Sequence, residues 1–142
     1  MNKGTDSRIL IFVAIVWTAA AISSFPHISR AEGAISDEPP ISGNAETGKL
    51  LFEKRCTGCH SLDKNKEGPR LRDVYGRKAG AVADFSYSDE LKAAHIVWDE
   101  GSLNHWLTNP EVVVPNNDMA FHVSSPQERA DIIQFLRQSS GK

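Results

Sequence analysis

Apolar residues recur at helical spacing in two stretches of the chain, one near its middle and one near its C-terminus. In the first, Asn44 can cap a helix that carries the apolar residues 50–52 and ends at the cysteine at position 56. The second begins with the sequence SPQE at residues 125–128, which places a serine at the N-cap, a proline at the first helical position and a glutamate at the third. The apolar residues of IIQFL at 132–136 follow on one face. The pattern therefore predicts a first and a last helix.

Shorter helices are expected between these two. Residues 101–108, GSLNHWLT, form a helical pattern that stops before Pro110, and residues 88–94 form a short one. Glycine and proline residues mark the remaining segments as turns and ordered loops, and no stretch alternates apolar and polar residues long enough to form a sheet. The sequence predicts a loop-rich all-α domain whose apolar core is incomplete, so something else should fill it.

The N-terminal end has a different composition. Residues 9–22, ILIFVAIVWTAAAI, carry no charge and follow a short charged start, the arrangement of a secretory signal. This stretch is shorter than the roughly 20 apolar residues that cross a bilayer comfortably. We therefore expect residues 1–31 to be a signal peptide cleaved after Ala31, where Ser29 and Ala31 supply small side chains. An uncleaved anchor formed by residues 9–25 is the alternative.

The rest of the chain is expected to be one domain. Residues 32–42 are acidic and contain a Pro-Pro pair, which predicts a flexible lead-in, and the folded domain would span residues 43–142. The whole chain of 142 residues has a net charge of −2, and from Glu32 onward thirteen Lys and Arg face seventeen Asp and Glu, a net charge of −4. This balance argues against nucleic acid as a partner.

The two cysteines lie in the sequence Cys56-Thr57-Gly58-Cys59-His60. In a CxxCH sequence the two thiols add to the vinyl groups of one haem, and the adjacent histidine becomes an axial iron ligand. Two intervening residues let both sulfurs reach one edge of the macrocycle, and export would bring the chain to a compartment where this attachment occurs. A thioredoxin-like dithiol would need a preceding strand, and a structural zinc site would need four ligands. The motif therefore predicts one covalently bound haem c.

The other side of the iron needs a ligand as well. Met119, in the segment VVPNNDMAFH, is the only methionine besides Met1, and a loop rich in Pro and Asn would present its thioether. His95, His105 and His122 are the competing ligands, and His122 is the nearest in sequence. A thioether favours ferrous iron and raises the potential, whereas a second imidazole would lower it. We expect His60 and Met119 to be the metal ligands.

Longer stretches carry a resemblance to a known family. Besides CxxCH, the chain contains in order GNAETGKLLFEKRC, EGPRLRDVYGRKAG, FSYSDELK, the region of Trp98, LTNP with VPNNDM, and QERADIIQFLR. In these it resembles the class I cytochromes c, specifically the mitochondrial cytochrome c and bacterial cytochrome c2 group, over roughly 100 residues. The resemblance implies an all-α fold in which the first and last helices cross, with Gly48 and Phe52 packed near Phe135.

The resemblance also implies roles for further residues around the haem. Pro69 would accept a hydrogen bond from Nδ1 of His60 and so fix the orientation of the ring. Phe121 would lie beside the haem on the methionine side. The residues expected to bind the haem propionates are Arg77, Tyr87 and Trp98.

The chain departs from the family pattern in ways that matter. Trp106 and Asn117, both expected beside the haem, replace a Tyr and a Thr, so the phenolic hydrogen bond near the methionine sulfur is lost. Leu91 replaces an Asn. The lysines that surround the haem edge of mitochondrial relatives are largely missing, since Glu111 and Asp118 stand at two of their places.

The residues and the resemblance together predict a soluble periplasmic one-electron carrier and not an enzyme. We expect a monomer that exchanges electrons with membrane or periplasmic redox proteins, docked through basic or apolar surfaces. Contact with the membrane is expected only if the N-terminal segment is retained. The less favoured alternative is a five-coordinate haem protein that binds peroxide, NO or CO.

Overall fold

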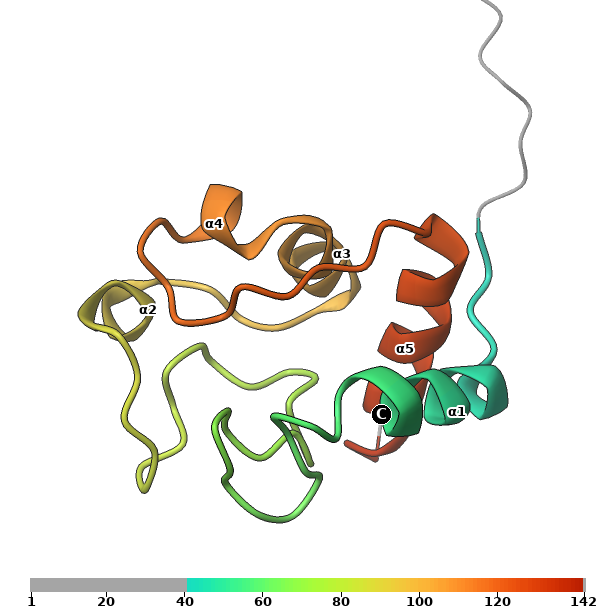
Figure 1. Ribbon diagram of the computed structural model, residues 1–142, viewed down its shortest axis with the longest axis horizontal. Helices are drawn as coiled ribbons and strands as arrows, with labels where there is room; N and C mark the ends of the chain where they lie inside the picture. Colours follow the sequence, from blue (N-terminus) through green and yellow to red (C-terminus); the bar gives the residue numbers. More distant parts are fainter. Residues whose placement is uncertain (1–40, 142) are drawn as a thin grey trace, which may run out of the picture. The chain divides into compact units, whose positions relative to one another are not determined.

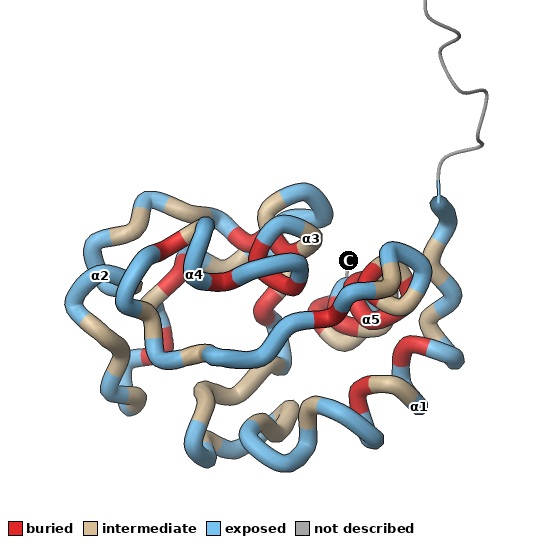
Figure 2. The backbone as a smooth tube through the Cα atoms, turned by 45° about the horizontal axis from the view of Figure 1, so that its top comes forward, coloured by how far each residue is buried: buried red, intermediate tan, exposed pale blue. Residues whose placement is uncertain are grey.

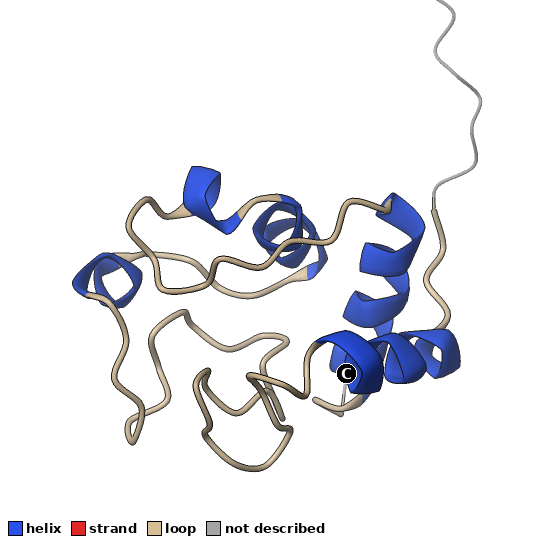
Figure 3. Ribbon diagram, viewed as in Figure 1, coloured by secondary structure: helices blue, strands red, loops and turns tan. Residues whose placement is uncertain are grey.

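The computed structural model describes residues 41–141, which contain five helices: α1 (Ala45–Arg55), α2 (Asp89–Ala93), α3 (Glu100–Thr108), α4 (Pro110–Val113) and α5 (Pro126–Gln138) (Figure 1). The rest of this part of the chain is loop, including the long segment between α1 and α2 (Figure 3). Its only β-type pairing is an isolated bridge between Lys78 and Val97. The predicted all-α class is confirmed.

None of the helices described is long and apolar enough to cross a membrane. The predicted signal segment, residues 1–31, lies outside the described residues, as does all of the lead-in except residues 41 and 42.

The predicted capping residues begin the first and last helices. The Asn44 side chain accepts a hydrogen bond from the backbone N–H of Thr47 at 2.9 Å. The Ser125 side chain accepts one from the N–H of Glu128 at 3.3 Å. Each bond satisfies a backbone donor that has no partner within its helix, so both starts agree with the sequence pattern.

Two features of the helix ends were not expected. Asp99 and Ser102 form a reciprocal capping box at the start of α3, with each side chain bonded to the other residue's backbone N–H. Pro110, expected in a turn, is instead the first residue of the one-turn helix α4 and follows the N-cap Asn109. A proline suits this position because its missing N–H would have no partner there and its φ is already helical.

Helices α1 and α5 cross (Figure 1), and two contacts allow their close approach. A Cβ atom on Gly48 would lie 1.9 Å from the backbone oxygen of Asp131, so only glycine fits at this position. The Phe52 and Phe135 rings pack beside it with their centroids 5.3 Å apart. The buried carboxylate of Asp131 accepts a hydrogen bond of 2.7 Å from the N–H of Asn44. The expected crossing of the first and last helices is confirmed.

The buried residues come from α1, α3 and α5 and also from the segments between the helices, for example Val74, Val82 and Val123 (Figure 2). The buried Arg129 of α5 holds the segment that precedes its own helix. Its Nε donates to Oδ1 of Asn104 at 2.8 Å, and its Nη1 donates to the carbonyl oxygens of Val123 and Ser124 at 2.8 and 2.9 Å. These bonds join α3, α5 and the loop that leads from residue 119 to α5.

Candidate functional site

A largely apolar cavity of about 270 Å³ lies between the long segment that follows α1 and the part of the chain from residue 98 to residue 121. Buried core residues of α1, α3 and α5 form its floor, among them Phe52, Leu103 and Ile132. Ten of the eleven predicted site residues line it: Cys56, Cys59, His60, Pro69, Arg77, Tyr87, Trp98, Trp106, Met119 and Phe121. The structure thus brings together residues that are up to 65 positions apart in sequence.

The cysteine motif forms a tight turn at the end of α1. The N–H of Cys56 donates to the carbonyl oxygen of Phe52 at 2.8 Å, and the N–H groups of Cys59 and His60 both donate to the carbonyl oxygen of Cys56, at 3.1 and 2.8 Å. The turn brings both sulfurs and the imidazole into the wall of the same cavity. This is the arrangement that attachment through two neighbouring thiols and one axial histidine requires.

His60 is held in one orientation by the next segment of chain. Its Nδ1 lies 2.8 Å from the carbonyl oxygen of Pro69, the contact that the resemblance implied. Because the carbonyl can only accept, Nδ1 carries the proton and Nε2 is left as the basic nitrogen. Burial lowers the pKa of the ring, which favours the neutral form that an iron ligand needs.

Gly68 provides the space for this ring, a role that was not predicted from the sequence. A Cβ at residue 68 would lie 2.2 Å from Cε1 of His60 and 2.6 Å from Nδ1. A glycine next to Pro69 was visible in the sequence, but it reads there only as a turn signal. Its contact with a residue eight positions earlier follows from the loop conformation.

Cys56 and Cys59 do not form a disulfide with each other. Burial raises the pKa of the Cys56 thiol to about 11. The Cys59 thiol donates a hydrogen bond of 3.5 Å to Oε2 of Glu67, and this bond raises its pKa. Glu67 also lines the cavity and is a neighbour of the thiols that the sequence analysis did not single out.

A group of polar side chains lies at another part of the cavity wall. The guanidinium of Arg77 donates to the carbonyl oxygens of Arg72 and Arg70, each at 2.9 Å, and burial lowers its pKa. The backbone N–H of Trp98 donates to the carbonyl oxygen of Arg77 at 2.9 Å, which brings these two residues together. Burial raises the pKa of Tyr87. The wall therefore offers a half-buried cation and neutral N–H and O–H donors, which suit carboxylate groups.

Met119 lies on the segment between α4 and α5, and two side chains hold it. Its backbone N–H donates to Oδ1 of Asn117 at 2.7 Å, and its Sδ lies 3.0 Å from Nε1 of Trp106. The phenolic bond near the sulfur is absent, as expected, but the indole N–H takes its place. Asn117 is the one predicted site residue that does not line the cavity, because its amide turns toward the carbonyl oxygen of Val114, at 2.8 Å.

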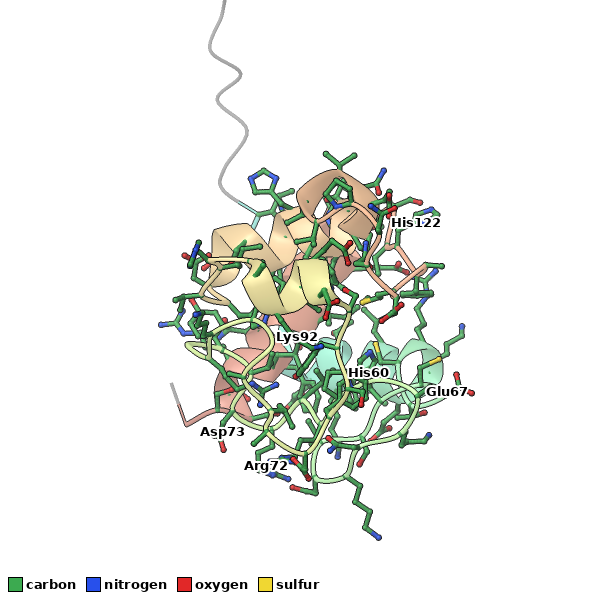
Figure 4. The ribbon with its side chains drawn as sticks, turned by 90° about the vertical axis from the view of Figure 1, so that its left-hand side faces the viewer. His60, Glu67, Arg72, Asp73, Lys92 and His122 are labelled. Carbon is green, nitrogen blue, oxygen red and sulfur yellow. The ribbon has the colours of Figure 1, made fainter. Side chains whose placement is uncertain are left out.

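The three histidines that compete with Met119 in the sequence lie elsewhere. His95, His105 and His122 are all exposed, and none of them lines the cavity. Figure 4 shows His122 apart from His60. Of the four candidates for the second axial position, Met119 is therefore the one that lines the cavity together with His60.

Aromatic residues complete the wall near Met119. The rings of Trp98 and Trp106 pack with their centroids 5.2 Å apart, and both are buried. Phe121 is 39% exposed and forms an outer edge of the cavity, with the guanidinium of Arg55 6.0 Å from its ring centroid. A flat apolar group with one polar edge fits a space that has apolar walls, two thiols on one side and carboxylate-binding donors on another.

Comparisons with known proteins agree with this geometry. The sequence profile of the cytochrome c family matches residues 45–140. Cytochrome c of Euglena viridis is 46% identical over 98 residues, which cover 67% of this chain and 96% of the relative. Cytochrome c of Cochliobolus lunatus is 41% identical over 102 residues, covering 69% and 94%.

A solved structure extends the agreement to the fold. Cytochrome cH from Methylobacterium extorquens matches with a TM-score of 0.64 and 40% sequence identity, covering 68% of this chain and 99% of that chain. The part matched by the family profile, residues 45–140, contains the turn that bears Cys56 and Cys59, the crossing helices α1 and α5, and the residues that line the cavity. The chain therefore belongs to the cytochrome c family, as a class I domain that binds one haem covalently through its two cysteines and serves as an electron carrier.

Proposed function

We propose that the protein is a periplasmic one-electron carrier whose haem iron has His60 and Met119 as its two axial ligands. The observation that carries this proposal is that the two side chains come from distant parts of the sequence and line the same cavity as Cys56 and Cys59. The haem supplies the Fe(II)/Fe(III) couple. With both axial positions filled by the chain, no place remains for a substrate, and we infer that the protein is not an enzyme.

The surrounding residues would hold the cofactor and keep water away from it. Pro69 fixes the His60 ring through the 2.8 Å contact at Nδ1, so Nε2 keeps its orientation. Arg77, Tyr87 and Trp98 would bind the propionates, and the apolar floor would exclude solvent. A dry and rigid site changes little when charge moves, which favours fast electron transfer.

Cellular location and partners are part of the same proposal. We infer that residues 1–31 direct export and are removed after Ala31, that residues 32–42 form a lead-in, and that the domain spans residues 43–142. A net charge of −4 from Glu32 onward suits membrane or periplasmic redox partners with basic or apolar docking surfaces. We propose that the carrier works as a monomer.

The axial assignment can be tested with the haem-loaded protein. Met119→Leu should abolish the far-red sulfur-to-iron charge-transfer band and lower the midpoint potential, because the thioether is replaced by a side chain that cannot ligate. Val112→Leu is the matched control, since residue 112 is 77% exposed on α4 and should leave both properties unchanged. If Met119→Leu leaves the band and the potential unchanged, the assignment is wrong. Rapid CO binding by the reduced parent protein would instead favour the five-coordinate alternative.

A further inference from the structure

The cavity reaches the surface at one edge. Exposed lining residues come from two segments: the end of α1 with the loop that follows it, and the segment that carries Met119. We call these residues the rim: Arg55, Cys59, Glu67, Asp118, Ala120 and Phe121. The other lining residues are buried or half-buried. An electron that enters or leaves the cavity therefore crosses the least protein at the rim.

The single cation of the rim is already paired. Arg55 forms an ion pair with Glu128 of α5, and its guanidinium lies 6.0 Å from the ring centroid of Phe121. Arg55 and Glu128 together add no net charge. Lys66, the residue before Glu67, donates its ammonium to the carbonyl oxygen of Thr57 and is the cation to be weighed against the carboxylates of the rim.

The two carboxylates of the rim have no cationic partner. In residues 41–141 neither Glu67 nor Asp118 forms an ion pair. Glu67 accepts a hydrogen bond of 3.5 Å from the Cys59 thiol. When this thiol adds to a vinyl group, its proton passes to a vinyl carbon as the carbon–sulfur bond forms, so haem attachment removes the donor. Glu67 is then free to bind a cation of another molecule.

A third carboxylate lies beside the rim. Glu111 of α4 and the rim residue Ala120 line a second, polar cavity of about 370 Å³. Glu111 accepts hydrogen bonds of 3.0 and 3.2 Å from the N–H of Asn116, which leave its negative charge in place. Both segments of the rim therefore carry uncompensated carboxylates, and the second also presents an exposed apolar pair, Ala120 and Phe121.

We propose that the rim is the docking surface for a redox protein that presents Lys or Arg side chains around an apolar patch, and that Glu67 and Asp118 are the residues that select this partner. Opposite charges raise the rate of encounter and fix the orientation, whereas an acidic partner is repelled. Ala120 and Phe121 supply the apolar contact. The inference rests on the proposed function, since it names where the carrier meets its partner and which charge the partner has there.

Two small oxidants of opposite charge test the local charge in the haem-loaded ferrous protein. Tris(phenanthroline)cobalt(III) carries a charge of 3+ and hexacyanoferrate(III) a charge of 3−, and each takes one electron from the haem. At about 0.1 M ionic strength the Debye length is about 10 Å, so only nearby charges act on either oxidant. The measurement is the ratio of the two bimolecular rates. A change in driving force moves both rates in the same direction, whereas a change in local charge moves them in opposite directions.

Glu67→Gln and Asp118→Asn should each lower the ratio of the cobalt rate to the hexacyanoferrate rate about fivefold. Glu46→Gln is the control, because it removes the same charge from the exposed first turn of α1, about 14 Å along the helix from Arg55. It should change the ratio no more than about twofold. If Glu46→Gln lowers the ratio as much as the rim variants do, net charge and not the rim is responsible, and the proposal is wrong.

A charged surface tests docking itself. On gold coated with an ammonium-terminated alkanethiol monolayer, the parent protein should give a reversible voltammetric wave that added salt removes, and Glu67→Gln/Asp118→Asn should weaken this wave far more than Glu46→Gln does. An equal or stronger parent wave on a carboxylate-terminated monolayer would overturn the proposal. A parent protein without a reversible one-electron couple in solution would overturn the proposed function itself, a result distinct from the others.

Discussion

Gly68 and His60 are in direct contact: the glycine leaves the space that the imidazole occupies, and a Cβ at residue 68 would lie 2.2 Å from Cε1 of the ring. The next residue of the same loop also contacts the ring, since the carbonyl oxygen of Pro69 lies 2.8 Å from Nδ1. Two successive residues thus determine both the position and the tautomer of the proposed iron ligand.

Gly68→Ala adds only one methyl group, but it should lower both the stability of the protein and the yield of attached haem. The ring and the loop must move apart, and overpacking of this kind costs about 1–3 kcal/mol. Guanidinium denaturation of the haem-loaded protein would measure the loss of stability, and the yield of covalently attached haem should fall as well. Gly101→Ala is the control, because residue 101 is exposed on α3 and its nearest contact would be 3.6 Å away. Equal stability of the two variants would contradict the role assigned to Gly68.

Gly48→Ala tests the helix crossing. The added methyl group would lie 1.9 Å from the carbonyl oxygen of Asp131, and a backbone atom in α5 cannot move aside without moving the helix. We expect a loss of about 3 kcal/mol or more in the free energy of unfolding, at the upper end of overpacking costs. Thr47→Ala, at the exposed neighbouring position, should change stability by no more than about 0.5 kcal/mol. A similar change for both variants would show that α1 and α5 can separate at little cost.

Asn117→Ala tests the support of the Met119 segment. The variant removes the acceptor of the Met119 N–H at 2.7 Å and the donor to the carbonyl oxygen of Val114 at 2.8 Å. The loss of these hydrogen bonds should reduce by about 1 kcal/mol the free energy that holds the segment in place. Added imidazole should then displace the methionine more easily, so the affinity of imidazole for the ferric protein should rise about fivefold. Val112→Ala, on the exposed side of α4, should leave this affinity unchanged. An unaltered imidazole affinity in Asn117→Ala would mean that other contacts hold the segment.

Stability should depend on pH through two exposed ion pairs in the long loop. A hydrogen bond from Arg70 lowers the pKa of Asp84 below 3.8, and one from Arg72 lowers that of Asp63 in the same way. A carboxyl whose pKa is lower in the folded state stabilises the fold above pH 3.8, and this contribution is lost as the pH falls through the folded-state pKa.

The free energy of unfolding of the parent protein should fall as the pH drops below 3.8, and in Asp84→Asn this fall should be smaller. The measurement is denaturation at a series of pH values in low salt, since salt screens exposed pairs. Glu90→Gln, which alters an exposed carboxylate that forms no ion pair among the described residues, is the control. If both variants lose stability with pH as the parent does, the pair with Arg70 contributes nothing.

Much of the molecule could be predicted because local signals and long-range contacts agree. The capping residues Asn44 and Ser125 predict where their helices begin from patterns of about four residues. The CxxCH motif predicts haem attachment from five adjacent residues. The family resemblance then supplied distant pairs that no local pattern contains, such as Gly48 with Phe135.

The rest depended on contacts that only the folded loops create. A Trp in place of a Tyr at position 106 removes a hydroxyl, which the sequence shows, but the direction of the indole N–H toward Met119 depends on how α3 packs. Likewise, Asn117 was expected beside the haem, and its short side chain instead bonds within its own loop. Glu67 lies close to Cys59 because the chain reverses between them, which spacing alone does not show.

The crossing of α1 and α5 also has a consequence for the order of events during synthesis. The cysteine motif continues directly from α1, whereas the helix that packs on α1 follows about 70 residues later in the chain, at residues 126–138. A nascent chain that emerges N-terminus first cannot close the domain until residues 126–138 have emerged. Until then both thiols remain open to whatever machinery delivers the porphyrin, so the topology itself leaves time for maturation before the core is sealed.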